Sequence, residues 1–283
     1  ARDPAAREKG AVSAVRSALK AFGAAIGHIR RGPAAAPLAL YFLLKLCIIL
    51  LYAHGRSGSP ASLWKILRLG SRAEALSHYP DRLIAMPFVL GRLDVPLEIL
   101  VLSFAQGATA LLVALSAGGE RPAVRAVLAR LRPRYAHLAA AAAIVSIALF
   151  ASFRYPSWLL GRLAGVPRAW ELAIAIPASL AAQAFFLYAV PFIVLEERSA
   201  IGALKRSAAF AARHFIESLT LAAIPFIITL PTLILALNSR AAAIRISPEF
   251  LVHAQIAGAF VECASGYLLI GGLTLYLLGA RSK

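Results

Sequence analysis

The chain has 283 residues, of which 60% are hydrophobic, and its mean hydropathy of +0.74 excludes an ordinary soluble domain. Its formal net charge is +17, but the basic residues are scattered among apolar stretches and form no long basic block. That distribution argues against a nucleic-acid-binding protein. Retention beside anionic lipid headgroups explains the charge, at about 1 kcal/mol for each Lys or Arg near the surface. We therefore expect anionic membrane lipids, and no nucleic acid, as partners.

Residues 1–33 are polar and basic and are expected to form an N-terminal arm. Between residues 4 and 30, apolar side chains recur at helical spacing with basic ones between them, namely Ala11, Val15, Leu19, Phe22 and Ile26. The pattern predicts an amphipathic helix that lies on the inner membrane surface, with its apolar stripe in the headgroup boundary. The arm lacks the apolar core of a signal peptide, so we expect the first span to act as the insertion signal.

Six apolar runs follow, and a bilayer core needs roughly 20 residues for each crossing helix. They lie at residues 34–53, 96–118, 138–153, 170–195, 219–237 and 250–280. Because every backbone N–H and C=O must be paired inside lipid, each run is predicted to be a helix. We therefore predict an all-α, polytopic membrane protein with about six transmembrane helices and amphipathic interfacial helices, in which residues 34–283 form a single domain.

The distribution of Lys and Arg predicts the orientation. With both termini inside, the cytoplasmic segments carry 18 Lys and Arg residues and the segments on the other side carry 11. The positive-inside rule favours this arrangement. The loop between the first two spans carries six basic residues and counts against it, although long loops obey the rule less strictly. We expect a multi-pass protein of a bacterial cytoplasmic (inner) membrane with both termini cytoplasmic.

The loop between the first two spans contains further apolar pieces. Residues 61–76 mix Leu and Ile with basic residues around Trp64, a residue type common at membrane interfaces. Residues 83–90 are apolar but too short to cross the bilayer, and Pro87 interrupts them. An interfacial segment is favoured there over a re-entrant piece or an upstream extension of the second span.

Three ionisable residues fall within or near the spans. Lys45 lies in the middle of the first, Glu98 near the start of the second and Glu262 in the middle of the sixth. A charge near the bilayer centre costs at least about 2.5 kcal/mol, so such groups usually face the bundle interior and find a partner. We predict that Lys45 pairs with Glu262. A structural pair that fixes helix register, or a snorkelling Lys45, is favoured over a proton or ion relay.

The most patterned stretch lies between the fourth and fifth spans. Its basic side, on a helical projection, consists of Arg198, Lys205, Arg206 and Arg213. Its apolar side consists of Ile201, Leu204, Ala208, Ala211 and Phe215. The pattern predicts a basic amphipathic helix on the inner surface, with Glu196 and Glu197 at its start, where negative charge is favourable. Pro191, near the end of the fourth span, is expected to kink that span.

This stretch resembles YciC-like membrane proteins and the membrane domain attached to some glycerophosphodiester phosphodiesterases. The residues that carry the resemblance are Pro191, Glu196, Ala203, Leu204, Lys205, Arg206 and Ser207. The resemblance covers the region around this loop together with the six-span plan. It implies a bacterial six-span membrane protein without an assigned role. Phosphodiesterase activity is not implied, because the chain has no hydrolase domain.

No known catalytic pattern occurs in the sequence. H-E-x-x-H, G-x-S-x-G, P-loop and EF-hand motifs are absent, and two isolated cysteines make no metal signature. We therefore expect no enzymatic activity, no metal and no cofactor. The favoured function is an accessory or scaffolding subunit of a larger membrane complex, with other membrane subunits as partners. The alternative is a transporter or lipid-handling protein that uses Lys45, Glu98 and Glu262, and the third candidate is an intramembrane enzyme acting on lipid.

Overall fold

The computed structural model describes residues 4–29, 33–54, 79–120, 122–161 and 168–281, and every regular element in these ranges is helical. The elements are α1 (Pro4–Ile29), η1 (Pro33–Ala35), α2 (Ala36–His54), α4 (Asp81–Leu97), η4 (Glu98–Leu102), α5 (Ser103–Ala117), α6 (Val124–Leu131), η5 (Arg132–Arg134), α7 (Tyr135–Gly161), α8 (Arg168–Phe186), α9 (Ala189–Leu195), α10 (Ala200–Arg213), α11 (Phe215–Leu237), α12 (Ser239–Arg245) and α13 (Phe250–Arg281). Within the described ranges, six helical segments are long and apolar enough to cross a membrane. The predicted all-α, six-span plan is confirmed. The expected interfacial piece at 61–76 lies outside the described residues.

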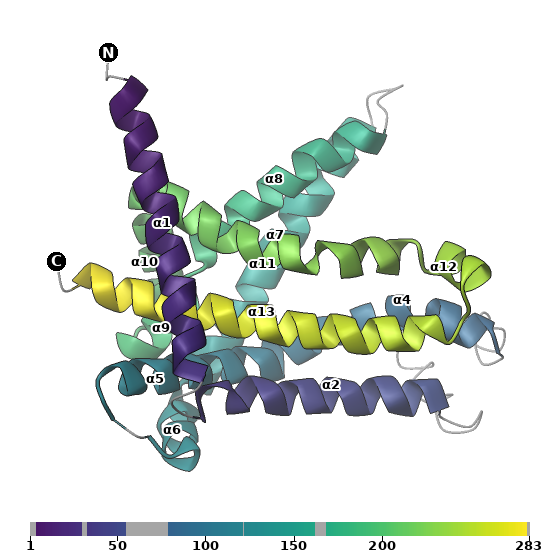
Figure 1. The fold of residues 1–283 in the computed structure, drawn as a ribbon, viewed down its shortest axis with the longest axis horizontal. Coiled ribbons are helices and arrows are strands. Elements are labelled where there is room, and N and C mark those ends of the chain that lie inside the picture. Colours follow the sequence, from purple (N-terminus) through teal and green to yellow (C-terminus); the bar gives the residue numbers. More distant parts are fainter. Residues whose placement is uncertain (1–3, 30–32, 55–78, 121, 162–167, 282–283) are drawn as a thin grey trace.

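The long helix α13 is the centre of the bundle. It packs against α1, α2, α5 and α11, and the helices α2, α11 and α13 run side by side along the long axis of the molecule (Figure 1). Helices α7 and α8 form an inclined pair that contacts α10 and α11. Both termini lie at the end of the bundle that also holds α6, α9 and α10, whereas α12 lies at the opposite end (Figure 1).

The second span is longer than predicted. Helix α4 continues through the π-helical segment η4 into α5, so Asp81–Ala117 is one uninterrupted helical segment. Residues 83–90 are therefore an upstream extension of this span, and the preference for an interfacial segment was wrong. Pro87 and Pro96 lie inside α4 without ending it, because neighbouring turns supply the remaining backbone hydrogen bonds.

The N-terminal helix α1 uses a small-residue face that the sequence pattern did not indicate. Its buried side chains are Ala14, Ala18, Ala21, Phe22 and Ala25. This face lies on α13, where the absence of side chains at Gly271 and Gly272 allows close approach; a Cβ on Gly271 would lie only 3.0 Å from that of Ala25. Val15, Leu19 and Ile26 of the predicted apolar stripe are exposed on α1. Phe22, which was predicted to belong to the same stripe, is buried against α13 instead.

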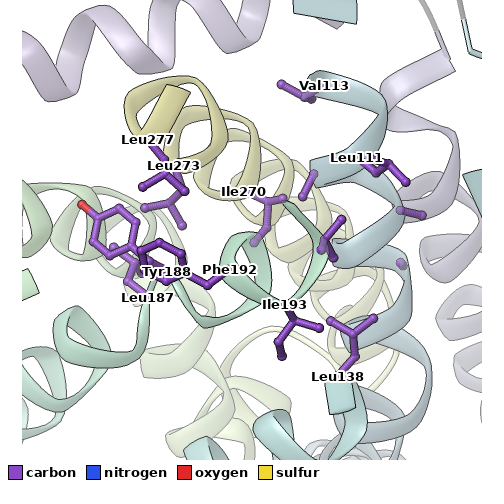
Figure 2. Close-up of a cluster of buried hydrophobic side chains, with 14 of the residues drawn as sticks. Leu111, Val113, Leu138, Leu187, Tyr188, Phe192, Ile193, Ile270, Leu273 and Leu277 are labelled. Atoms are coloured by element: carbon purple, nitrogen blue, oxygen red, sulfur yellow. The ribbon is translucent and has the colours of Figure 1, made fainter. Parts of the chain in front are cut away.

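The main hydrophobic core lies where α5, α7, α9 and α13 meet. In Figure 2, Tyr188 and Phe192 lie close to Leu273 and Leu277 of α13, and Ile193 lies toward Leu138 of α7. The Tyr188 ring also packs edge-on against Phe210 of α10, with centroids 4.8 Å apart. Aromatic contacts of this kind fix the end of the bundle that carries the termini.

The fourth span is broken, as the position of Pro191 predicts. A two-residue turn separates α8 from α9, one turn before Pro191, which lacks the N–H needed for a regular helix. Ser207 of α10 pairs the backbone groups at this break. Its hydroxyl donates to the Phe185 carbonyl (2.7 Å) and accepts from the Tyr188 N–H (3.0 Å). Ser207 therefore links α10 to the broken fourth span.

Helix α10 is present, but its buried face differs from the predicted one. The buried residues are Ala200, Ala203, Leu204, Ser207 and Ala211. Ile201 is 61% exposed, because the face is centred on the hydrogen-bonded Ser207 instead of the large apolar residues. The placement of Glu196 and Glu197 in the first helical turn was also wrong. The helix begins at Ala200, and the side chain of Ser199 caps it.

The link between α9 and α10 is held by Arg134. Its guanidinium donates to the Val194 carbonyl (2.8 Å) and forms an ion pair with Glu197. The hydrogen bond and charge of Arg134 lower the pKa of Glu197 below its ordinary value of 4.5. Glu197 has a φ of 57°, in the left-handed region that non-glycine residues rarely adopt, and the ion pair helps to hold it there.

Candidate functional site

Lys45 is the centre of an ion cluster contributed by α2, α4 and α13. Its Nζ lies 2.7 Å from Glu262 Oε2 and 2.9 Å from Asp94 Oδ1. The predicted pair between Lys45 and Glu262 is thus present. The Lys45 side chain is only 9% exposed, whereas those of Asp94 and Glu262 are 30% and 32% exposed. Two carboxylates sharing one ammonium make the buried charge tolerable inside a membrane bundle.

Asp94 is the member of the cluster that the sequence prediction missed. It precedes the apolar run at 96–118, so hydropathy alone places it outside the span, whereas α4 extends the span far enough upstream to include it. The spacing of Asp94 relative to Glu98 is the sequence feature that could have indicated its place in the cluster. Asp94 and Glu98 are one helical turn apart and therefore share a helix face if the helix begins before residue 94.

Glu98 lies beside the cluster but does not join it by direct contact. In the described part of the chain, no basic side chain lies within salt-bridge distance of its carboxylate. Its charge is nevertheless repelled by Asp94 and Glu262 and attracted by Lys45. Glu98 is also the first residue of the π-helical segment η4, a type of local irregularity that is frequent at functional sites.

A cavity of 480 Å³ opens next to the ion cluster. Its walls come from α2, α4, α11 and α13, and Lys45, Asp94 and Glu262 form its charged part. The uncharged polar residues that line it are Thr229, Thr232 and Gln255. Most of the remaining lining is apolar and includes Ile48, Leu90, Leu93, Leu97, Phe226 and Leu233. Its size is that of sites for drug-sized molecules.

Missing side-chain volume and irregular backbone help to form this cavity. Pro87 and Gly91 of α4 line it, and a Cβ built on Gly91 would meet no atom within 4 Å. Opposite helix α11 contains Pro225 and Pro231, and the Thr229 hydroxyl donates to the Pro225 carbonyl (3.0 Å). Each proline inside a helix removes one backbone N–H, and the loss is tolerated at membrane depth where the helix lines a cavity.

Tyr41 adds a polar atom beside the cluster. Its ring centroid lies 5.8 Å from Lys45 Nζ, close enough for a cation–π contact. Its hydroxyl is buried and has no hydrogen-bond partner among the described residues. A buried, unpaired hydroxyl is costly, and Tyr41 has a donor available for a further acceptor.

The other predicted site residues lie elsewhere. Pro191 and Ser207 belong to the broken fourth span, and neither lines the cavity. Lys205, Arg206 and Arg213 are exposed on α10, at the end of the bundle that carries the termini. Glu196 forms an ion pair with Arg198, with Oε2 and Nε 2.6 Å apart. The predicted site residues therefore lie in two separate regions, one at the Lys45 cluster and one at α9 and α10.

The comparisons with protein-family models, curated proteins and solved structures gave no match. The resemblance to YciC-like proteins therefore stays a prediction. In the described ranges, no group of three or more His, Cys, Asp or Glu side chains is arranged to hold a metal ion. The cavity and its charges are therefore the features of the described chain that bear most directly on function.

Proposed function

We propose that the protein is a transporter or lipid-handling protein that binds an amphiphilic molecule in the cavity between α2, α4, α11 and α13. The observation that carries the proposal is the combination of a 480 Å³ space, an ion cluster on one part of its wall and apolar side chains on the rest. Membrane helices associate mainly through close packing. An open space between helices means that the surrounding side chains lose packing contacts. A binding site accounts for that loss, whereas a purely structural bundle does not.

The charges favour a ligand with a cationic group. Asp94 and Glu262 outnumber Lys45 in the lining, and Glu98 adds a third carboxylate nearby. A bound cation would share the carboxylates that Lys45 now holds, while the apolar walls would take up the body of the ligand. Discrimination against anionic ligands follows, because an anion would meet two like charges in a low-dielectric site.

A fluorescent lipophilic cation such as rhodamine 6G tests this proposal in detergent-purified protein. A Cβ on Gly91 meets no atom within 4 Å, so Gly91→Leu extends a side chain into the cavity. Gly266→Leu adds the same side chain at another open helix position that does not line the cavity. Fluorescence anisotropy should show about tenfold weaker binding for Gly91→Leu, which corresponds to about 1.4 kcal/mol. Gly266→Leu should bind like the unmodified protein.

Removal of a carboxylate provides a second arm of the experiment. Asp94→Asn should weaken binding of the cation, and Glu120→Gln, outside the cavity, should not. An anionic dye of similar size should bind poorly to all forms. Equal affinity of the unmodified protein and Gly91→Leu for the cation would contradict the proposal, as would a preference for the anionic dye.

We also place the protein in a bacterial cytoplasmic membrane with both termini on the cytoplasmic side. The support is the excess of Lys and Arg in the segments on the terminus-bearing side, including α6 and α10. Fusing green fluorescent protein or alkaline phosphatase to the C-terminus tests the orientation. A fluorescent first fusion and an inactive second one are expected, and the opposite result would reverse the assignment.

The accessory-subunit function stays a prediction. Exposed apolar residues such as Leu51 and Ile147 fit lipid as well as a protein partner. Extraction in a mild detergent distinguishes the two functions, since an accessory subunit should purify together with stoichiometric partners and a self-sufficient binding protein should not.

A further inference from the structure

A second, smaller pocket lies at the end of the bundle that carries both termini. It has a volume of 190 Å³ and is formed by α9, α10, His214 between α10 and α11, and the C-terminal part of α13. Arg206, Arg213 and His214 contribute its basic groups, and Phe192 and Phe210 contribute aromatic walls. This pocket is distinct from the cavity at the Lys45 cluster and shares no residue with it.

The two arginines of this pocket, Arg206 and Arg213, are its main cationic groups. Among the described residues, no carboxylate lies within salt-bridge distance of either Arg206 or Arg213. Glu196 also lines the pocket, but its carboxylate already pairs with Arg198 at 2.6 Å. The pocket therefore presents two guanidinium groups that form no salt bridge within the described part of the chain.

The two arginines are held on one helix face. They are seven residues apart on α10, which corresponds to almost two full turns and places both on the same side. Helix α10 is anchored by the two hydrogen bonds of Ser207 and by the packing of Phe210 on Tyr188. The Arg206 guanidinium lies 5.9 Å from the centre of the Phe192 ring, which orients it further.

We propose that this pocket binds a phosphate group. Guanidinium groups match phosphate oxygens with paired hydrogen bonds, and such charge-assisted bonds are stronger than neutral ones. The phosphate can come from an anionic phospholipid headgroup or from a soluble phosphate. The place of the pocket, where transmembrane helices end beside exposed basic residues of α10, favours the lipid headgroup. This inference does not depend on the function proposed for the larger cavity.

Native mass spectrometry of the detergent-solubilised full chain tests the inference. The protein is mixed with phosphatidylglycerol or phosphatidylcholine, and the retained lipid is counted. The unmodified protein should prefer phosphatidylglycerol, and Arg206→Gln/Arg213→Gln should reduce that preference about tenfold. The matched control is Lys20→Gln/Lys205→Gln, which removes the same charge from exposed positions outside the pocket and should change the preference less than about twofold.

A lysine variant and a phosphate competitor complete the experiment. Arg206→Lys/Arg213→Lys keeps the charge but loses the paired donors, so its preference should lie between those of the unmodified and glutamine forms. Inorganic phosphate is added as a competitor. Complete displacement of phosphatidylglycerol at millimolar phosphate, without any lipid preference, would keep the phosphate chemistry and exclude the lipid as its source.

Three results would overturn the inference. The first is an equal loss of preference in the pocket variant and the Lys20→Gln/Lys205→Gln control, since diffuse surface charge would then explain the binding. The second is full retention of the preference in the glutamine variant. The third, which remains decisive even if the glutamine variant does not fold, is a lysine variant that binds like the unmodified protein.

Discussion

Replacing Lys45 by methionine removes the cation that joins α2, α4 and α13. The substitution keeps a long, unbranched side chain, so the packing changes little while the ammonium is lost. It leaves Asp94 and Glu262 as two carboxylates without their partner, 30% and 32% exposed. Breaking a buried ion pair by removing one partner typically costs about 3–5 kcal/mol. Partial exposure of both carboxylates reduces that cost, so we expect about 2–3 kcal/mol of lost unfolding free energy.

The second carboxylate determines how the single and double substitutions combine. Glu262→Gln leaves Lys45 paired with Asp94 at 2.9 Å, so it should cost only about 1 kcal/mol. The double variant Lys45→Met/Glu262→Gln leaves Asp94 alone, and its cost should be about 2 kcal/mol. The double variant should therefore be milder than the sum of the single variants by about 1–2 kcal/mol.

Unfolding free energies are measured by circular dichroism in mixed micelles with increasing sodium dodecyl sulfate. Glu98→Gln is the matched control, because this carboxylate has no salt-bridge partner among the described residues and its neutralisation relieves repulsion from Asp94 and Glu262. It should leave stability unchanged or raise it. Costs for Lys45→Met and Glu262→Gln that add within about 0.5 kcal/mol would refute the reasoning, since independent sites behave in that way.

Three further substitutions test the rest of the bundle. Ser207→Ala removes both hydrogen bonds at the broken fourth span and should cost about 1–3 kcal/mol of unfolding free energy, measured in the same micelles. Gly271→Leu should push α1 away from α13, which hydrogen exchange detects as faster exchange in α1. Glu197→Gln should flatten the acid side of a plot of unfolding temperature against pH. The lowered pKa of Glu197 means that the ion pair with Arg134 stabilises the fold above pH 4.5 and that this contribution is lost as the pH falls through the lowered pKa.

Each of these substitutions has its own check. Ser17→Ala, at an exposed position of α1, should cost less than about 0.5 kcal/mol, and an equal cost for Ser207→Ala would remove its special role. A Cβ on Gly266 meets no atom within 4 Å, so Gly266→Leu should leave exchange in α1 unchanged. An acid-side slope that is the same with and without the Glu197 carboxylate would show that this ion pair does not contribute.

Hydropathy and charge were sufficient to predict the number of spans and the pairing of Lys45 with Glu262. Both residues lie near the middle of long apolar runs, where opposite charges can hardly remain apart. Asp94 escaped the same reasoning because Arg92, Asp94 and two prolines lower the apolar character of α4. A helix that is stabilised by its neighbours does not need an unbroken apolar sequence, so its true beginning was not visible.

Helical projections failed where backbone pairing determined which residues are buried. On α10, the polar Ser207 is buried and Ile201 is exposed, because the serine completes the hydrogen bonding of the broken span. On α1, Ala25 lies against Gly271 and Phe22 against Gly272, whereas Val15, Leu19 and Ile26 stay exposed. Projections rank positions by size and polarity, and close approach between helices in lipid rewards small residues instead.

The segment Asp81–Ala117 has 37 residues, so at 1.5 Å per residue it is about 55 Å long. Even a tilt of about 40°, the upper end of the usual range, leaves it about 12 Å longer than a hydrocarbon core of about 30 Å. Part of the segment must therefore lie beyond a hydrocarbon core of this thickness. At its Asp81 end the chain is tied to other elements, since Tyr79 donates to Glu249 (2.6 Å) and Arg82 donates to the Ala53 carbonyl (2.6 Å). Lipid chains beside this helix must therefore stretch to match it, or one of its ends must lie among the headgroups.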